Sequence, residues 1–299
     1  MARGKSKALA ARKAAAPKDW WRSFFGPLAG MVMFEPRAHE SADEVDIVLR
    51  RTRTKPGARV LDVACGTGRH TLIFAQRGYE VVGLDYSVPY LRQAREQLRK
   101  SGLAGRAKLV RGDMRRASAH VGHARFDLAV SLYNSFGYFD RRGDDRRVLR
   151  EVFRALKPGG AFVLNTLHEG GVRHRLKAPM RLGHEPLKNV FMIDQIAYDK
   201  RKRKTQGRWT IVDARGPRVA IARLRLSQNV YSHVELKAML RRAGFRIESV
   251  WGMLEGAPFK QTTWHQTIVA RKPGLGALRT AYRVSPPAGA ATRGQGVLR

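Results

Sequence analysis

The stretch from Val60 to His70, VLDVACGTGRH, constrains the fold of this chain more than any other segment. An apolar run leads into a loop with glycines at positions 66 and 68, and a helical pattern begins at about Arg69. A second apolar run, Glu80 to Leu84, ends on Asp85, 17 residues after the second glycine. A buried strand, a glycine loop, a helix and a second buried strand ending on an acid are typical of half a nucleotide-binding βαβ unit.

The residue types in this unit point to a ligand but leave its identity open. A side chain at Gly66 or Gly68 would hold a ligand away from the backbone N–H groups at the helix start. The Asp85 carboxylate can accept hydrogen bonds from both hydroxyls of a ribose, a property that dinucleotide oxidoreductases share. Two details favour a different ligand: Thr71 stands where the dinucleotide fingerprint has its third glycine, and Asp62 lies inside the first strand, ahead of the loop.

On these residues the chain resembles the class I S-adenosylmethionine-dependent methyltransferases, over roughly residues 20–272. Asp62, Gly66 and Gly68 match the first motif of the family, although Ala64 stands where its first glycine commonly lies. Asp85 matches the acid that binds the ribose. The narrower resemblance is to bacterial methyltransferases of the small-molecule type that have a strand-rich insertion after the fifth strand.

Three later segments extend the resemblance in the order that the family has them. Gly112-Asp113-Met114, after a strand at 107–110, matches the segment that holds the adenine. The segments Phe126 to Phe139 and Leu156 to Thr166 look like strand four with its loop and the turn into strand five. The resemblance implies S-adenosyl-L-methionine as the cofactor, with an Asp113 carboxylate on the exocyclic amine and Met114 on the ring. The cofactor-binding residues that it implies are Asp62, Ala64, Cys65, Gly66, Gly68, Asp85, Tyr86, Asp113 and Met114.

The expected fold is α/β: a doubly wound, seven-stranded, mostly parallel sheet of the Rossmann-like methyltransferase type, with its seventh strand antiparallel. Extended segments at 190–198, 208–213 and 218–226 predict an antiparallel β meander inserted before the last helix and packed over the substrate mouth. We expect a disordered basic arm at 1–19, one domain at 20–272 with its insertion at about 171–230, and a disordered tail at 273–299. An aromatic cluster ahead of the fold is either a lid over a ligand or a helix packed on the core; it comprises Trp20, Trp21, Phe24 and Phe25.

Charge is the compositional anomaly of this chain, whose formal net charge is +34. The first 22 residues carry +6 and the last 27 carry +4, so the excess is spread over the whole protein. Such an excess raises affinity for any polyanion without selecting RNA, DNA or anionic lipid. Two groups could contact nucleic acid or simply face water: the run Lys200 to Lys204, and the helical ridge of Arg142, Arg146, Arg147, Arg150 and Arg154.

Methyl transfer from a sulfonium is an in-line displacement that depends mainly on positioning, so the loop after strand four carries our catalytic prediction. Asn134 and then Tyr133 are predicted to position the acceptor, and the alternative is that this loop only shapes the cofactor pocket. His168 and His265 are the histidines placed to approach a pocket, where a structural role is the commoner one. We expect no metal, because no histidine, cysteine and acid have the spacing of metal ligands.

The function expected from these features is S-adenosylmethionine-dependent methyl transfer to a nitrogen or oxygen of a small molecule. The alternatives are an RNA methyltransferase, which the basic surface favours, and a noncatalytic adenosylmethionine-binding protein. The single cysteine, Cys65, excludes an intramolecular disulfide and favours the cytoplasm. No apolar run reaches the roughly 18 residues of a membrane span, so no membrane partner is expected. The sequence leaves the acceptor and the oligomeric state open.

Overall fold

A seven-stranded sheet forms the centre of the protein in the computed structural model, which describes residues 16–274. The expected tail, and all of the expected arm except 16–19, lie outside the described residues. The strand order is β10-β11-β5-β4-β1-β2-β3, and β11 is antiparallel to both of its neighbours while the other pairs are parallel. The strands are β1 (Arg59–Val63), β2 (Glu80–Asp85), β3 (Ala107–Arg111), β4 (Phe126–Ser131), β5 (Leu156–Leu167), β10 (Arg246–Trp251) and β11 (His265–Arg271). The predicted α/β sheet with an antiparallel seventh strand is therefore confirmed.

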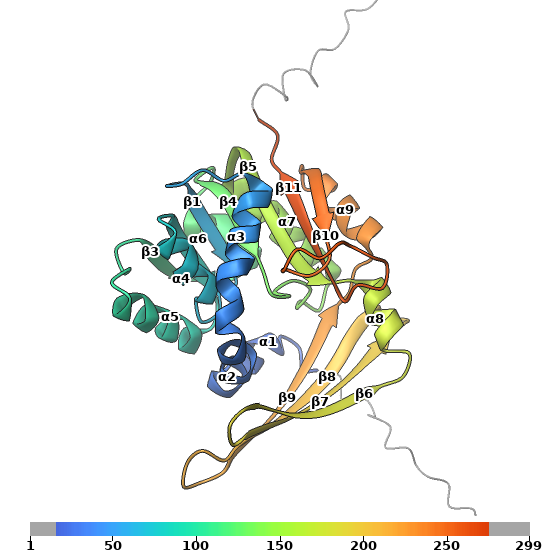
Figure 1. The fold of residues 1–299 in the computed structure, drawn as a ribbon. Coiled ribbons are helices and arrows are strands. Elements are labelled where there is room, and N and C mark those ends of the chain that lie inside the picture. The colour runs from blue at the N-terminus through green and yellow to red at the C-terminus, as the bar shows by residue number, and fades with distance from the viewer. Residues whose placement is uncertain (1–15, 275–299) are drawn as a thin grey trace, which may run out of the picture.

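Helices cover both faces of this sheet (Figure 1). Side chains of α6, α7 and α9 pack on one face, and those of α3, α4 and α5 on the other. The helical elements are α1 (Trp21–Phe24), α2 (Pro27–Phe34), η1 (Glu35–Glu40), α3 (Ser41–Thr52), α4 (Arg69–Gln76), α5 (Val88–Lys100), η2 (Met114–Arg116), α6 (Ala117–Val121), α7 (Arg142–Ala155), α8 (Glu169–Arg175) and α9 (His233–Arg242). No helix among the described residues is long and apolar enough to span a membrane.

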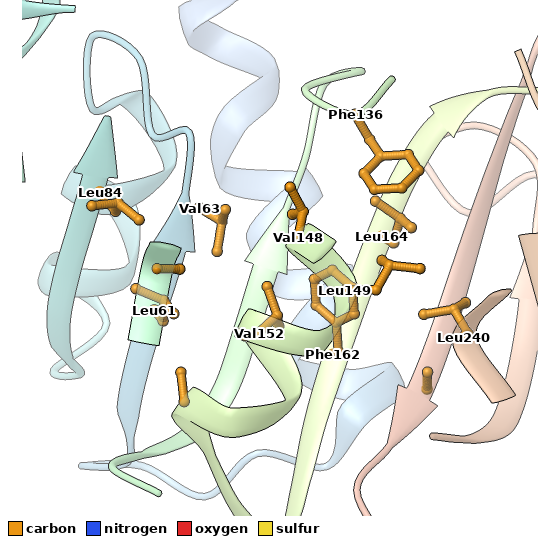
Figure 2. Packing of buried hydrophobic residues seen from close by; sticks show 14 of the residues in the cluster. Leu61, Val63, Leu84, Phe136, Val148, Leu149, Val152, Phe162, Leu164 and Leu240 are labelled. Atoms are coloured by element: carbon orange, nitrogen blue, oxygen red, sulfur yellow. The ribbon is translucent and has the colours of Figure 1, made fainter. Parts of the chain in front are cut away.

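Helix α7 packs on the sheet through the apolar face that its sequence pattern predicts. Its apolar residues recur at helical spacing, so Val148, Leu149 and Val152 share one face and are almost fully buried. Figure 2 shows these side chains against Phe162 and Leu164 of β5. This contact fixes α7 on the sheet beside the carboxyl ends of β4 and β5, where the loop after β4 begins.

The insertion forms a separate four-stranded antiparallel sheet, which we call the meander and which extends from the carboxyl edge of the central sheet (Figure 1). Its strands, in spatial order, are β6 (Met180–Leu187), β7 (Val190–Asp199), β8 (Lys204–Asp213) and β9 (Ala220–Asn229). The sequence predicted only the last three of these. Strand β6 is exposed along most of its length, so it lacks the apolar alternation that reveals a half-buried strand.

Two arginines predicted to face solvent are structural. Arg203, in the basic run at 200–204 that was predicted to stay out of the core, is partly buried and pairs with Glu169 and with Glu235. Arg142, predicted to belong to the arginine ridge, bonds Glu235 at 2.9 Å and the Arg203 carbonyl oxygen at 3.1 Å. Both predictions were wrong at these positions because Glu169 of α8 and Glu235 of α9 recruit the guanidinium groups. The remaining ridge arginines are exposed.

Candidate functional site

Three residues of the loop between β1 and α4 have a left-handed backbone conformation. Ala64, Gly66 and Gly68 have φ values of +59°, +58° and +81°. At Ala64 the side chain makes this conformation unfavourable by roughly 1–2 kcal/mol, because its Cβ crowds the following carbonyl oxygen. A Cβ added at Gly68 would lie 2.7 Å from Cβ of Ala94 on α5. The second glycine is thus required by the close approach of α4 and α5, as well as by the turn itself.

Asp62 and Thr71, the two residues that set this loop apart from the dinucleotide fingerprint, contact each other. The Thr71 hydroxyl donates to Oδ2 of Asp62 at 2.7 Å, and both residues are buried. Burial raises the pKa of Asp62, against the opposing influence of His70 and of this hydrogen bond. The Asp62 carboxylate therefore anchors the start of α4 behind the loop.

A buried charged cluster that the sequence did not reveal supports the same helix. Glu44 of α3 pairs with Arg69 at 2.9 Å and with His70 at 2.6 Å. The Arg69 guanidinium also lies 4.5 Å from the ring centre of Tyr133, in the loop after β4. Through Arg69 this cluster connects the glycine loop to the segment predicted to position the acceptor.

Asp85 closes the glycine loop at the end of β2. Its Oδ2 accepts from the backbone N–H of Gly66 at 2.8 Å, and its Oδ1 accepts from that of Ser87 at 2.7 Å. Burial raises the pKa of Asp85 to about 6, although these backbone donors favour the ionised form. Each oxygen still has an acceptor site, so this carboxylate can take two further hydroxyl donors.

Asp113 and Met114 follow β3 in the order that the sequence predicts. The Asp113 carboxylate pairs with Arg115 at 2.6 Å; burial opposes its ionisation, but the guanidinium lowers its pKa below the usual value. Gly112 before it has no room for a side chain, because an added Cβ would lie 2.6 Å from the ring of His120. His120 belongs to α6, and its ring packs on this turn.

These segments enclose one cavity, which we call the glycine-loop cavity. It includes six of the nine predicted cofactor residues: Ala64, Gly66, Asp85, Tyr86, Asp113 and Met114. Asp62, Cys65 and Gly68 do not line it. Its other walls are largely aromatic and come from the N-terminal helices and the loop after β4; they include Trp21, Phe25, Phe34, Tyr133, Tyr138 and Phe139.

The loop after β4 has an unusual backbone at the two residues predicted to be catalytic. Tyr133 and Asn134 have φ values of +55° and +65°, a region that residues other than glycine seldom adopt. The Asn134 side chain holds this shape: its oxygen accepts from the Leu167 backbone N–H at 3.0 Å and from Nε2 of Gln228 at 2.7 Å. Its own amide nitrogen donates to Oε1 of Gln228 at 3.1 Å. Asn134 thus ties the loop to strand β9 of the meander.

Two further cavities border this loop. One, the meander cavity, has a volume of about 190 Å³, lies under the inner face of the meander and includes Asn134 in its wall. The other, the outer cavity, has a volume of about 570 Å³ and is bordered by Tyr133, Asn165 and His265. His168 lines none of the three cavities; it is 1% exposed and packs on Phe259. Of the two histidines singled out in the sequence, only His265 faces a cavity.

Comparison with known proteins identifies this arrangement. Residues 60–160 match the family model described as a methyltransferase domain. The whole fold superposes on an S-adenosylmethionine-dependent methyltransferase from Clostridium acetobutylicum with a TM-score of 0.69 at 17% identity, covering 79% of this chain and 92% of that one. The chain has the fold of the class I methyltransferases. The family model covers the glycine loop, Asp85, Asp113 and the loop after β4.

Sequence relatives of this chain include enzymes named for small acceptors. It is 33% identical to a glycine/sarcosine N-methyltransferase of Halorhodospira halochloris, over 43% of this chain and 47% of that protein. It is 34% identical to the dTDP-3-amino-3,4,6-trideoxy-alpha-D-glucopyranose N,N-dimethyltransferase of Streptomyces venezuelae, over 42% of this chain and 49% of that protein. The chain thus spans about half the length of the curated relatives that it matches.

The chemistry of the glycine-loop cavity fits S-adenosylmethionine, the cofactor of these methyltransferases. Asp85 has two free acceptor sites, as a ribose diol requires, Asp113 adds a second carboxylate, and the aromatic walls suit a planar base. The enclosed volume is about 70 Å³, however, well below the roughly 300–1,000 Å³ of small-molecule sites. Phe25, Met33 and Phe34 of the N-terminal segment form part of its wall.

The aromatic cluster packs on the core, which is one of the two alternatives considered for it, and it also contributes to the cavity wall. Trp20, Trp21 and Phe24 are at most 7% exposed and belong to the main hydrophobic core. Trp21 also lines the glycine-loop cavity, where its ring meets that of Tyr86 edge to face at 4.9 Å. Among the described residues no group of three or more histidine, cysteine and acidic side chains is arranged to hold a metal ion.

Proposed function

We propose that this protein is an S-adenosylmethionine-dependent methyltransferase whose acceptor is a nitrogen or oxygen of a small molecule. The proposal rests mainly on one observation: the glycine-loop cavity and the meander cavity are neighbours, and both are lined by residues of the loop after β4. The glycine-loop cavity and the meander cavity share Phe25, Met33 and Tyr138 in their walls, and Asn134 borders the second. A small acceptor under the meander would therefore lie next to the cofactor.

Bound S-adenosylmethionine supplies an activated methyl group on a sulfonium. A lone pair of the acceptor forms the new bond to the methyl carbon while the carbon–sulfur bond breaks, and sulfur keeps that electron pair. The acceptor also loses its proton. A neutral amine can lose this proton after attack, whereas a hydroxyl benefits from a base that removes it during attack.

The contribution of the protein to this reaction is mainly positional. Asp85 and the glycine loop hold the donor in one orientation, and we propose that Tyr133 and Asn134 orient the acceptor behind the methyl group. The strained backbone at these two residues supports this role, because such strain persists only where the surroundings hold it in place. The Arg69 guanidinium over Tyr133 and the Gln228 amide on Asn134 supply that support.

Enclosure favours a small molecule over RNA as the acceptor. The meander covers a cavity of about 190 Å³, with a wall made mostly of apolar and aromatic side chains. A flipped nucleotide would need a path through this cover, along with a basic groove leading to Asn134. The relatives named for glycine, sarcosine and an amino sugar nucleotide point the same way. A single cysteine supports a reducing, cytoplasmic setting for this activity.

Incubation of the full chain with methyl-labelled S-adenosylmethionine and a fractionated cell extract tests the proposal. We expect label in the low-molecular-weight fraction and release of S-adenosylhomocysteine. Label in RNA alone would replace the acceptor class with the nucleic-acid alternative. Binding of S-adenosylmethionine by calorimetry without transfer to any fraction would favour a noncatalytic binding protein.

A further inference from the structure

The inner face of the meander contains an acid in an otherwise largely apolar wall. Side chains alternate along each strand, so Asp194 and Ile196 of β7 face the meander cavity together with Trp209 of β8 and Leu226 of β9. Aromatic side chains close the opposite side; they are Trp20, Phe24, Phe25 and Trp264. A carboxylate in such a wall is costly unless a partner neutralises it.

Asp194 has no cationic partner among the described residues, although the chain has 58 lysines and arginines. Burial raises the pKa of Asp194, while a hydrogen bond from Trp209 and the nearby His184 of β6 oppose that rise. Its second oxygen, Oδ1, is buried and has no hydrogen-bond partner among the described residues. One oxygen of the Asp194 carboxylate thus accepts a hydrogen bond, and the other remains available to a ligand.

Two more polar atoms in the cavity wall are also without a described hydrogen-bond partner. They are Oγ1 of Thr205, a residue that is 0% exposed, and Nε1 of Trp20, which is 3% exposed. Leaving a buried donor or acceptor unpaired costs about 1–3 kcal/mol. Native proteins seldom retain three such atoms around one cavity unless a ligand or water completes their bonding.

We propose that the meander cavity binds the amino group of the acceptor, with Asp194 as the counter-ion of a protonated primary or secondary amine. This inference rests on the proposed function and narrows its acceptor to the amines. An alkylammonium satisfies the free Asp194 oxygen and neutralises its charge, while the surrounding aromatic faces attract a cation. Before attack the ammonium gives one proton to the Asp194 carboxylate, which frees the nitrogen lone pair that forms the bond to the methyl carbon. A hydroxyl would supply one hydrogen bond but leave a buried carboxylate without a counter-ion.

The first test compares two probes of matched size, cyclohexylamine and cyclohexanol. Each is titrated into the full chain saturated with S-adenosylhomocysteine, and binding is followed by ligand-observed NMR. We expect the amine to bind at least about tenfold more tightly than the alcohol, since a hydrogen bond to a buried ion is about twice as strong as a neutral one. Equal affinities would overturn the inference.

Asp194→Asn tests the residue itself, because it keeps the shape and an acceptor for Trp209 while removing the charge. The preference for the amine should disappear in this variant. The matched control is Asp199→Asn on the same strand, whose carboxylate accepts from the Arg201 backbone N–H at 3.0 Å and does not line the cavity. A preference retained in Asp194→Asn, or lost equally in the control, would contradict the assignment.

Thr205→Val distinguishes a ligand site from a structural role. Replacing an unpaired buried hydroxyl with a methyl group should leave the midpoint of urea unfolding unchanged or higher, yet weaken amine binding by at least about threefold through the lost hydrogen bond. Unchanged amine binding would count against the cavity as the site. If S-adenosylmethionine itself does not bind, the proposed function fails with this inference; if methyl transfer occurs without any amine preference, only this inference fails.

Discussion

Replacing Asp85 with alanine should separate cofactor affinity from folding. The substitution removes two acceptor sites for ribose hydroxyls, each worth about 1.5–3 kcal/mol when the acceptor is ionised. A loss of at least about 3 kcal/mol corresponds to a Kd for S-adenosylmethionine raised by about a hundredfold or more.

The same substitution should affect stability far less. Two backbone N–H groups, of Gly66 and Ser87, lose their acceptor at a cost of about 1–3 kcal/mol each. Against this, a pKa raised from 3.8 to about 6 means that the buried charge costs about 3 kcal/mol at neutral pH. We therefore expect the free energy of unfolding to fall by no more than about 3 kcal/mol.

Isothermal titration calorimetry and urea unfolding measure the two effects separately. The matched control is Asp127→Ala, which also removes an acceptor from a backbone N–H, that of Arg59 at 2.9 Å, but at the start of β4. It should lower stability without changing cofactor affinity. A Kd in Asp85→Ala within about threefold of the unchanged protein, or an equal loss in Asp127→Ala, would refute the role assigned to Asp85.

Three other predictions follow from single features. Ala64→Gly relieves a positive φ, so stability should stay equal or rise by up to about 1 kcal/mol in urea unfolding; a clear loss would show that the methyl group is needed for packing. Burial raises the pKa of Asp145 to about 7, so between about pH 4 and 7 the native state holds a proton that the unfolded chain has released. Stability should therefore fall with rising pH across that window and fall less in Asp145→Asn, and equal pH slopes would contradict this. Cofactor binding should change the tryptophan emission of the native protein and change it less in Trp21→Phe, because Trp21 lines the glycine-loop cavity.

The sequence predicted the parts of the fold that depend on local patterns. Strand β1, Arg59–Val63, contains the apolar run that precedes the glycine loop, and α9 begins after Ser232, whose hydroxyl accepts from the Glu235 backbone N–H. Those signals are apolar runs, glycine turns and capping residues, which are read within a few positions along the chain.

The remainder depends on contacts between distant segments. Glu44 pairs with His70 across 26 positions, and Arg203 with Glu169 across 34, so no spacing rule reveals them. Sequence reasoning placed Asn134 in the correct loop, but its bonds to Gln228 span 94 positions. Nothing in the sequence predicted that Asp194 lines a cavity, because an acid in a strand usually faces water. Only the pairing of β7 with β8 shows that it faces inward.

The reciprocal amide bonds between Asn134 and Gln228 have a consequence for how acceptor range can change in this architecture. They connect strand β9 of the meander to the loop after β4, so a change in one of these two segments affects the other. A chimaera that receives the meander of another methyltransferase should keep a working loop only if its position 228 still presents a side-chain amide. Joint exchange of positions 134 and 228 is therefore the natural starting point for transplanting a new acceptor pocket onto this domain.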